Sequence, residues 1–180
     1  MKTDCDIKMA QALAAYAAGK FVIVVDDQER ENEGDLVISA EKVTVETIAF
    51  MIRHTTGIIC VSLPAERLHR LGLPLMVPDN TESQQTAFTV SVDASHGTST
   101  GVSASDRVNT IRALVHPNTT PNDLRRPGHV FPLKYCQGGV LKRAGHTEAA
   151  VDLAKLCGMS PAGVIAEVVN DNGSMARLPE

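Results

Sequence analysis

The chain has 180 residues, of which 43% are hydrophobic and 3% aromatic, and its formal net charge is −4. This length and composition predict one domain with a core of aliphatic side chains. The negative charge excludes a global basic field for nucleic acid, and the apolar runs of the sequence fall short of the roughly 18 residues that a membrane span needs.

The N-terminus and the cysteines bear on cellular location. Residues 1–6 lack the basic region and the apolar segment of a signal peptide. The four cysteines are widely spaced and form no Cys-x-x-Cys pair, which fits reduced thiols better than a disulfide framework or a zinc site. We therefore expect a cytoplasmic protein with no nucleic-acid or membrane partner.

Helices are predicted where apolar residues recur at helical spacing and a capping residue precedes them. Asp6, Thr44 and Thr147 are the expected N-caps of three helices, and Ser103 with Asp106 resembles a capping box at a fourth. The predicted helices cover residues 7–18, 44–53, 64–72, 103–115 and 147–158, and a brief helical turn follows at 160–161.

Strands are predicted where β-branched residues gather or where apolar and polar residues alternate. Residues 130–133 form a short, edge-like extended piece, 171–173 are a hairpin turn with a returning strand at 174–177, and 73–85 and 116–128 are loops. The remaining predicted strands cover residues 21–25, 36–38, 57–62, 86–93 and 163–169. Strands and helices mix without strict alternation, so we predict one α+β domain around a mixed sheet.

An acidic loop at residues 26–35 separates the first two strands. It holds six carboxylates in ten residues, which repel one another unless a cation or a basic partner sits among them. A solvated charged loop is one interpretation. A ligand site is the other, because the charges adjoin apolar strands and Gly34 permits a tight turn close to a ligand.

The segment 143–147, with the sequence RAGHT, combines a basic side chain, a glycine and a helix start. Arg143, Gly145 and Thr147 suit a phosphate at the positive end of the helix dipole, although a plain capped helix start has the same pattern. His146, with one carboxylate of the acidic loop, would suffice for Mg²⁺, and Mn²⁺ would tolerate the nitrogen at least as well.

Three further residues are candidates, although each alone also has a structural explanation. Glu167 lies in a mostly apolar strand, where a carboxylate either faces water or is buried with a raised pKa that suits acid–base catalysis. His129 could act in the same way. Cys60 ends an apolar strand and by default packs as a small hydrophobic residue.

Six motifs in one order resemble the 3,4-dihydroxy-2-butanone 4-phosphate synthase family, a group of enzymes of riboflavin biosynthesis. The resemblance runs from about residue 7 to residue 180. Its motifs are DDQERENEGD at 26–35, TAFTVSVD at 86–93, TSTGVSASDR at 98–107, RPGHVFPL at 126–133, GGVL at 138–141 and RAGHTE at 143–148.

The resemblance implies a lyase that converts ribulose 5-phosphate to 3,4-dihydroxy-2-butanone 4-phosphate and formate. It implies a requirement for Mg²⁺, for which Mn²⁺ can substitute, and no organic cofactor. It also implies a homodimer with active sites near the interface, and an α+β sandwich of helices around a mixed sheet.

The resemblance also implies residue roles. Glu31 and His146 bind the metal, and His129 and Glu167 match essential positions. Arg30 and Asp35 contact the sugar. The segment that binds the phosphate comprises Arg143, Ala144, Gly145 and Thr147. The weaker candidates for substrate contact or catalysis are Glu33, Cys60, Asp93 and Thr100.

The chemistry of the implied reaction needs several proton transfers. We hypothesise that Glu33 or Asp35 starts the enolisation, because crowded negative charge raises the pKa of one carboxylate. Glu167 and His129 would serve later transfers. We also expect the acidic loop to close over the substrate and exclude water.

The sequence departs from the family pattern at its C-terminus, which ends at residue 180, a few tens of residues before relatives end. It also lacks the cysteine-rich zinc domain of GTP cyclohydrolase II, so one synthase domain over residues 1–180 is expected. Residues 54–57 lie in a variable region, and we assign no role to His54. Alternatives are another Mg²⁺-dependent sugar-phosphate enzyme, such as an isomerase, and a non-catalytic binding module.

Overall fold

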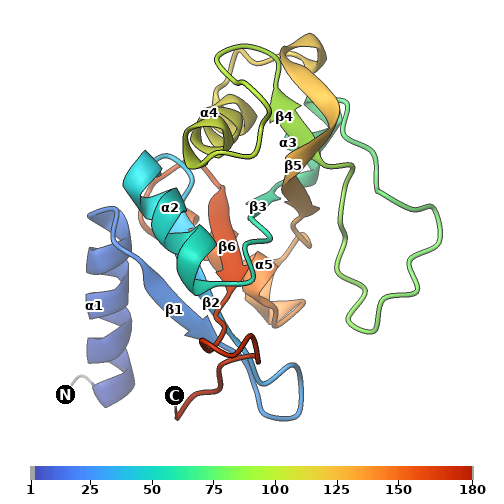
Figure 1. Ribbon diagram of the computed structural model, residues 1–180. Coiled ribbons are helices and arrows are strands. Elements are labelled where there is room, and N and C mark those ends of the chain that lie inside the picture. The colour runs from blue at the N-terminus through green and yellow to red at the C-terminus, as the bar shows by residue number, and fades with distance from the viewer. Residues whose placement is uncertain (1–2, 180) are drawn as a thin grey trace.

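The computed structural model describes residues 3–179, and these residues form a six-stranded mixed sheet with strand order β1-β2-β6-β3-β5-β4 (Figure 1). β3 and β5 are parallel, and the other neighbouring strands are antiparallel. The strands are β1 (Val22–Val25), β2 (Gly34–Ser39), β3 (Cys60–Leu63), β4 (Val92–Ala94), β5 (Leu124–Lys134) and β6 (Gly163–Glu167). The predicted α+β class with a mixed sheet is confirmed.

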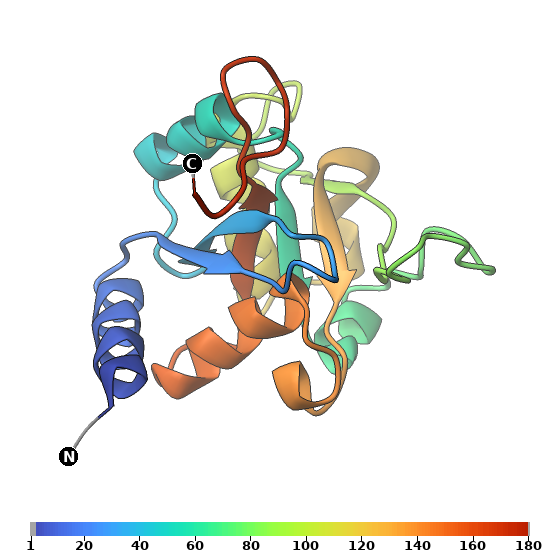
Figure 2. The ribbon, with the colours of Figure 1, turned by 90° about the horizontal axis from the view of Figure 1, so that it is seen from below.

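Helices cover both faces of this sheet (Figure 2). One core packs Tyr16 of α1 and Leu153 of α5 against Val37, and the other packs Ile48 of α2 and Ile111 of α4 against Ile38. The helices are α1 (Asp4–Ala17), α2 (Val45–His54), α3 (Ala65–Arg70), α4 (Ala104–Val115) and α5 (His146–Leu156), with 3-10 turns η1 (Pro121–Asp123) and η2 (Gly139–Leu141). Within the described residues, none of the helices is both long enough and apolar enough to cross a membrane.

The alternation of side chains along the strands determines which residues meet on the α5 face. Val37 packs on that face, so Asp35, two residues earlier in β2, points the same way. Asp35 is the cross-strand partner of Glu167, and Cys60 is the partner of Ile165. Two carboxylates and a thiol therefore project from neighbouring strands on the α5 side of the sheet.

Several predicted helix ends are wrong in detail. Thr3, not Asp6, caps α1, and Asp6 completes the capping box as its third helical residue. α5 begins at His146 after Gly145, so Thr147 is a buried residue of the first turn and not the N-cap. Residues 160–161 form no helical turn.

Thr44 caps α2 as predicted, and Ser103 caps α4 by accepting the amide of Asp106. The capping box at α4 is incomplete, however. The Asp106 carboxylate accepts from Ser99 and from the Gly101 amide, and so holds the preceding loop in place.

The predicted strands near residues 86–134 also need correction. β4 covers residues 92–94, so only residues 92 and 93 of the predicted 86–93 strand belong to it. Thr89 is buried, and its hydroxyl donates to the Pro132 carbonyl. The expected edge-like piece at 130–133 belongs to β5, which begins at Leu124 and lies between β3 and β4. The predicted hairpin turn at 171–173 is present, but its returning strand is reduced to a bridge between Val169 and Met175.

Candidate active site

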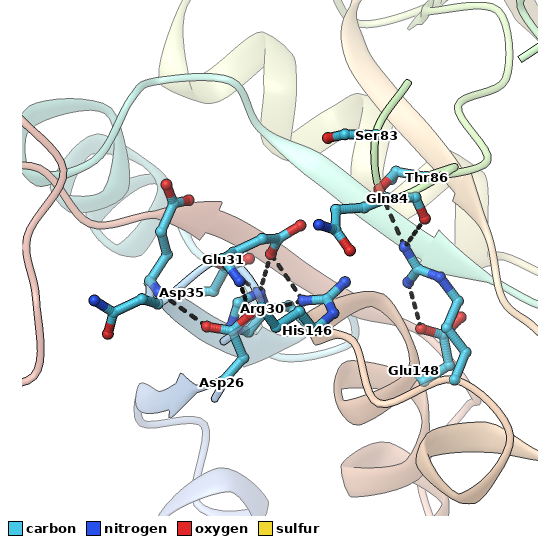
Figure 3. A network of polar contacts seen from close by, with 12 residues as sticks. Asp26, Arg30, Glu31, Asp35, Ser83, Gln84, Thr86, His146 and Glu148 are labelled. Carbon is cyan, nitrogen blue, oxygen red and sulfur yellow. Dashed lines mark hydrogen bonds and ion pairs between the residues drawn. The ribbon is translucent and has the colours of Figure 1, made fainter. Parts of the chain in front are cut away.

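Asp26, at the end of β1, organises the acidic loop (Figure 3). Its Oδ2 accepts from the Glu31 amide at 2.9 Å and from Arg30 Nη1 at 2.8 Å, and its Oδ1 accepts from the Glu33 amide at 2.9 Å. These bonds fold the loop back on its first residue. Asn32, between the two bonded amides, has a φ of 54°, a left-handed conformation that asparagine tolerates.

His146, the first residue of α5, meets the acidic loop. Its Nδ1 lies 3.3 Å from Glu31 Oε2 and 3.5 Å from Asp35 Oδ1. Burial disfavours the imidazolium, yet the hydrogen bond to Glu31 and the nearby carboxylates raise the pKa of His146 overall. The same hydrogen bond is the main cause of a lowered pKa at Glu31.

Asp35 is the most perturbed carboxyl of the loop. It is 3% exposed, and burial raises its pKa to about 7. Repulsion from Glu167, Glu31 and Glu33 adds to this effect, while His146 opposes it. Asp35 therefore exchanges its proton near neutral pH, as an acid–base group must.

Glu33 shares this environment to a smaller degree. Burial, and then the charge of Glu31, raise its pKa, whereas the Arg177 guanidinium opposes the rise. Arg177 reaches the loop from the C-terminal segment. Its Nη1 donates to the Glu31 carbonyl at 2.9 Å and to the Asn32 carbonyl, and lies 3.7 Å from Glu33 Oε1.

The residues of this cluster fit a divalent cation. Asp26, Glu31 and His146 each offer one ligand atom, and these atoms lie within 4.8 Å of one another. His146 Nε2 and Asp35 Oδ1 are buried without a hydrogen-bond partner among the described residues. Two carboxylates and one imidazole suit Mg²⁺ or Mn²⁺. A bound cation and its waters would also provide partners for His146 Nε2 and Asp35 Oδ1.

Arg143 precedes α5, and its partners Gln84, Thr86 and Glu148 lie at the other end of the site from Asp26 (Figure 3). Its Nη1 donates to Glu148 Oε2 at 2.7 Å, and its Nη2 donates to the Gln84 carbonyl at 3.1 Å and to Thr86 Oγ1 at 3.2 Å. Gly145 makes this arrangement possible, because a Cβ there would collide with Arg143 Nη1. The guanidinium thus ties the start of α5 to the loop between α3 and β4.

One pocket brings together most of the predicted site residues. It lies on the α5 face, and Glu82, Thr86, Phe88, Leu133 and Ile165 complete its wall. The predicted residues that line it are Arg30, Glu31, Glu33, Asp35, Cys60, Arg143, His146, Thr147 and Glu167. Ala144 is exposed and, like Gly145, is absent from the described lining of this pocket.

Cys60 and Glu167 differ in their suitability for proton transfer. Burial, and then the charges of Glu167 and Asp35, raise the pKa of the Cys60 thiol well above its usual range, so this side chain stays a neutral part of the wall. Glu167 is half-buried and accepts a 2.7 Å hydrogen bond from the Thr56 hydroxyl on Oε2. Its carboxylate is thus held at the pocket by a neighbouring loop.

The structure separates His129, Asp93 and Thr100 from the other predicted residues. His129 Nδ1 lies 2.8 Å from Asp93 Oδ2, and the His129 amide donates to Asp93 Oδ1 at 2.9 Å. Thr100 is exposed beside Gly101, where an added Cβ would collide with Asp93. Among the described residues, none of these three lines the pocket.

Sequence reasoning missed four residues that hold the site together: Asp26, Thr56, Glu148 and Arg177. Asp26 was counted only as one of the loop charges, and Glu148 only as the end of a motif. Thr56 and Arg177 lie 111 and 145 residues from the groups that they bind, so no local pattern could identify them.

Known proteins similar to this chain identify its family. The chain matches the family model of 3,4-dihydroxy-2-butanone 4-phosphate synthase over residues 10–180. It is 56% identical to the 3,4-dihydroxy-2-butanone 4-phosphate synthase of Agrobacterium fabrum, with 96% of this chain and 81% of that protein covered. It is 61% identical to a probable bifunctional riboflavin biosynthesis protein, RIBA 1, of rice, of which the chain spans 32%.

Solved structures of this family superpose on this chain over most of its length. A crystal structure of 3,4-dihydroxy-2-butanone 4-phosphate synthase in complex with two magnesium ions superposes with a TM-score of 0.89 at 51% identity. The match covers 91% of this chain and 76% of that one. A two-domain synthase, RibBX from A. baumannii, superposes with a TM-score of 0.90 at 48% identity, over 94% of this chain and 50% of that one.

Proposed function

Because the chain belongs to the 3,4-dihydroxy-2-butanone 4-phosphate synthase family, we propose that it converts ribulose 5-phosphate to 3,4-dihydroxy-2-butanone 4-phosphate and formate. The observation that carries this proposal is one pocket that combines three kinds of group. It holds two possible metal ligands, Glu31 and His146, a carboxyl with a pKa of about 7, and a guanidinium at a helix N-terminus. A phosphorylated sugar that must be enolised needs all three.

We assign the divalent cation, Mg²⁺ or Mn²⁺, to Glu31 and His146, with Asp26 beside them. The ligand types and the orphaned His146 Nε2 support this assignment. When bound, the cation would act as a Lewis acid that acidifies the substrate C–H bond and stabilises negative charge on oxygen. Asp26 already accepts three hydrogen bonds, so we expect it to orient the loop that carries Glu31.

The proton transfers are assigned to the chain's own carboxyls. Asp35 takes the first proton from carbon, because its pKa of about 7 allows it both to accept and to return a proton near neutral pH. Glu33, whose pKa is also raised, is the second candidate for this step. Glu167, the cross-strand partner of Asp35, serves a later transfer from the same side of the sheet.

The phosphate is assigned to the start of α5. The first-turn amides of an α-helix have no partner within the helix and lie at the positive end of its dipole. Arg143 adds a charged fork and Thr147 a hydroxyl at the wall of the same pocket. Arg143 now contacts Glu148, Gln84 and Thr86, so a bound phosphate would share this guanidinium with the loop that it tethers.

A homodimer would account for the position of His129. The resemblance implies that this residue is essential, yet His129 and Asp93 lie outside the pocket of the described chain. The resemblance also implies active sites near a dimer interface. A second copy of the chain that presents its own His129 at the pocket is consistent with both implications. The His129 side chain is 43% exposed and can therefore contact a second copy.

Following C4 through the reaction tests the proposed function. The protein would be mixed with ribulose 5-phosphate labelled with ¹³C at C4, with and without Mg²⁺, and monitored by NMR. We expect metal-dependent release of one labelled formate for each substrate consumed. Exchange of the C3 proton without formate would favour an isomerase instead, and neither signal from folded protein would favour a binding module.

A further inference from the structure

The loop between α2 and β3 holds Glu167 at two points. Thr56 Oγ1 donates to Glu167 Oε2 at 2.7 Å, and the Thr56 amide donates to the Glu167 carbonyl at 2.9 Å. Thr55 forms an antiparallel bridge with Val168 one residue further on. The loop therefore fixes both the backbone of Glu167, at the end of β6, and its carboxylate.

The direction of the Thr56 hydroxyl is determined by a second contact. The Ile58 amide donates to Thr56 Oγ1 at 3.3 Å, so the oxygen accepts from the backbone while its proton points to Glu167. A hydroxyl bound to an ionised carboxylate makes a charge-assisted hydrogen bond, which is about twice as strong as a neutral one. This bond is therefore strong enough to select one orientation of the long Glu167 side chain.

The charges around Glu167 make such a restraint necessary. Asp35 is its cross-strand partner, and Asp35 and Glu33 both interact with its charge. These carboxylates repel the Glu167 carboxylate. Because a glutamate side chain has several rotamers, this repulsion alone would let the carboxylate move away from the pocket. The hydrogen bond from the Thr56 hydroxyl limits this movement, because it holds Glu167 Oε2 at one position.

We propose that Thr56 is a positioning residue that holds the Glu167 carboxylate in place for proton transfer. The inference rests on the proposed function, in which Glu167 moves a proton. Thr56 itself does not touch the substrate. Because misplacing a reacting group by about 1 Å costs about a hundredfold in rate, loss of the hydroxyl should lower the turnover number while leaving substrate and metal binding intact.

The contribution of the side chain can be separated from that of the backbone. Valine and serine both keep the backbone N–H that donates to the Glu167 carbonyl. Thr56→Val replaces the hydroxyl by a methyl group, whereas Thr56→Ser keeps the hydroxyl and removes only the methyl group. Thr56 is exposed, and both variants are therefore expected to fold. Thr120→Val is the matched control, because Thr120 makes the same kind of bond, at 2.8 Å to Asp123 Oδ2, far along the chain from Glu167.

The test measures formate release, KM and Mn²⁺ affinity for the wild-type protein and for each variant. We expect Thr56→Val to lower kcat about ten- to a hundredfold with KM and Mn²⁺ affinity unchanged. Thr56→Ser and Thr120→Val should stay within about threefold of wild type, since one keeps the hydroxyl and the other spares the site. In a Glu167→Gln background, Thr56→Val should cause no further loss, because its effect passes through Glu167.

Equal kcat in Thr56→Val and wild type would overturn the proposal, and so would equal losses in the valine and serine variants. A change in KM or metal affinity alone would also overturn it. The ¹³C resonance of the Glu167 carboxyl gives a readout that needs no turnover, and it should move in Thr56→Val but not in Thr120→Val. Failure of the wild-type protein to release formate would instead reject the proposed function, while this resonance would still test the contact.

Discussion

Replacing Asp35 by asparagine is expected to stabilise the metal-free protein and to abolish the reaction. The Asp35 carboxyl is buried at the floor of the pocket and faces Glu167 across β2 and β6. Its pKa of about 7 shows that its charge is unfavourable in the folded protein, chiefly because of burial. Asparagine has nearly the same shape and no charge, so the substitution removes this cost while it keeps the packing.

The magnitude follows from the pKa of Asp35 in the folded and unfolded chain. A rise from 3.8 to about 7 is about three units, which corresponds to roughly 4 kcal/mol. Because the folded protein binds this proton more tightly than the unfolded chain does, the wild-type free energy of unfolding falls as pH rises from about 4 to about 7 and is then constant. The advantage of Asp35→Asn is therefore small near pH 4 and reaches about 4 kcal/mol near pH 8.

Urea denaturation in EDTA, at about pH 5 and about pH 8, would measure this difference. The advantage of Asp35→Asn should grow between the two pH values by roughly 2–3 kcal/mol. Glu29→Gln, which removes an exposed charge from the same loop, is the control. An advantage that does not change with pH, or a variant less stable than wild type at pH 8, would refute this account of the Asp35 charge.

Two further predictions concern residues at the edges of the site. Arg177→Met removes the donors to the Glu31 and Asn32 carbonyls, so the acidic-loop amides should exchange hydrogen faster and Mn²⁺ should bind several-fold more weakly; unchanged exchange would contradict this role. His129→Gln should lower formate release at least a hundredfold with Mn²⁺ affinity unchanged, because His129 lies outside the metal cluster. Mn²⁺ titration by electron paramagnetic resonance would check this variant, and a parallel loss of metal affinity would place His129 among the ligands instead.

The sequence was sufficient to predict the parts of the fold that local patterns determine. β-branched runs marked β1, β2, β3 and β6, and the acidic loop lies between β1 and β2 as predicted. Its predicted end is wrong, because Gly34 and Asp35 belong to β2 and Gly34 makes no turn. Local patterns were insufficient for β5, because residues 124–129 are rich in Arg, Pro and Gly and become a strand only through pairing with β4. Thr147 was mistaken for an N-cap because the glycine before His146 fills that position without a side-chain bond.

Local sequence patterns also predict only a part of the candidate site. Residues of the two strongest motifs, in the acidic loop and at 143–147, line one pocket, because α5 begins beside the acidic loop and the first residues of β2. His129, Asp93 and Thr100 do not join them in the described chain. His129 and Asp93 lie where β5 pairs with the edge strand β4, whereas, among the described residues, β5 reaches the pocket only through Leu133. The sequence could not predict the residues that support the site, because Thr56 and Arg177 act through contacts that exist only in the folded chain.

Labelled formate release by the wild-type protein and by Glu31→Gln, measured together in a Mg²⁺ titration, tests the central claim most directly. If the pocket is a metal-dependent synthase site, the wild-type protein releases formate from C4 as Mg²⁺ saturates it. The variant keeps its fold but needs at least tenfold more Mg²⁺ or stays inactive, because Glu31 is one of the assigned ligands. Equal formate release by both proteins at every Mg²⁺ concentration would contradict the account.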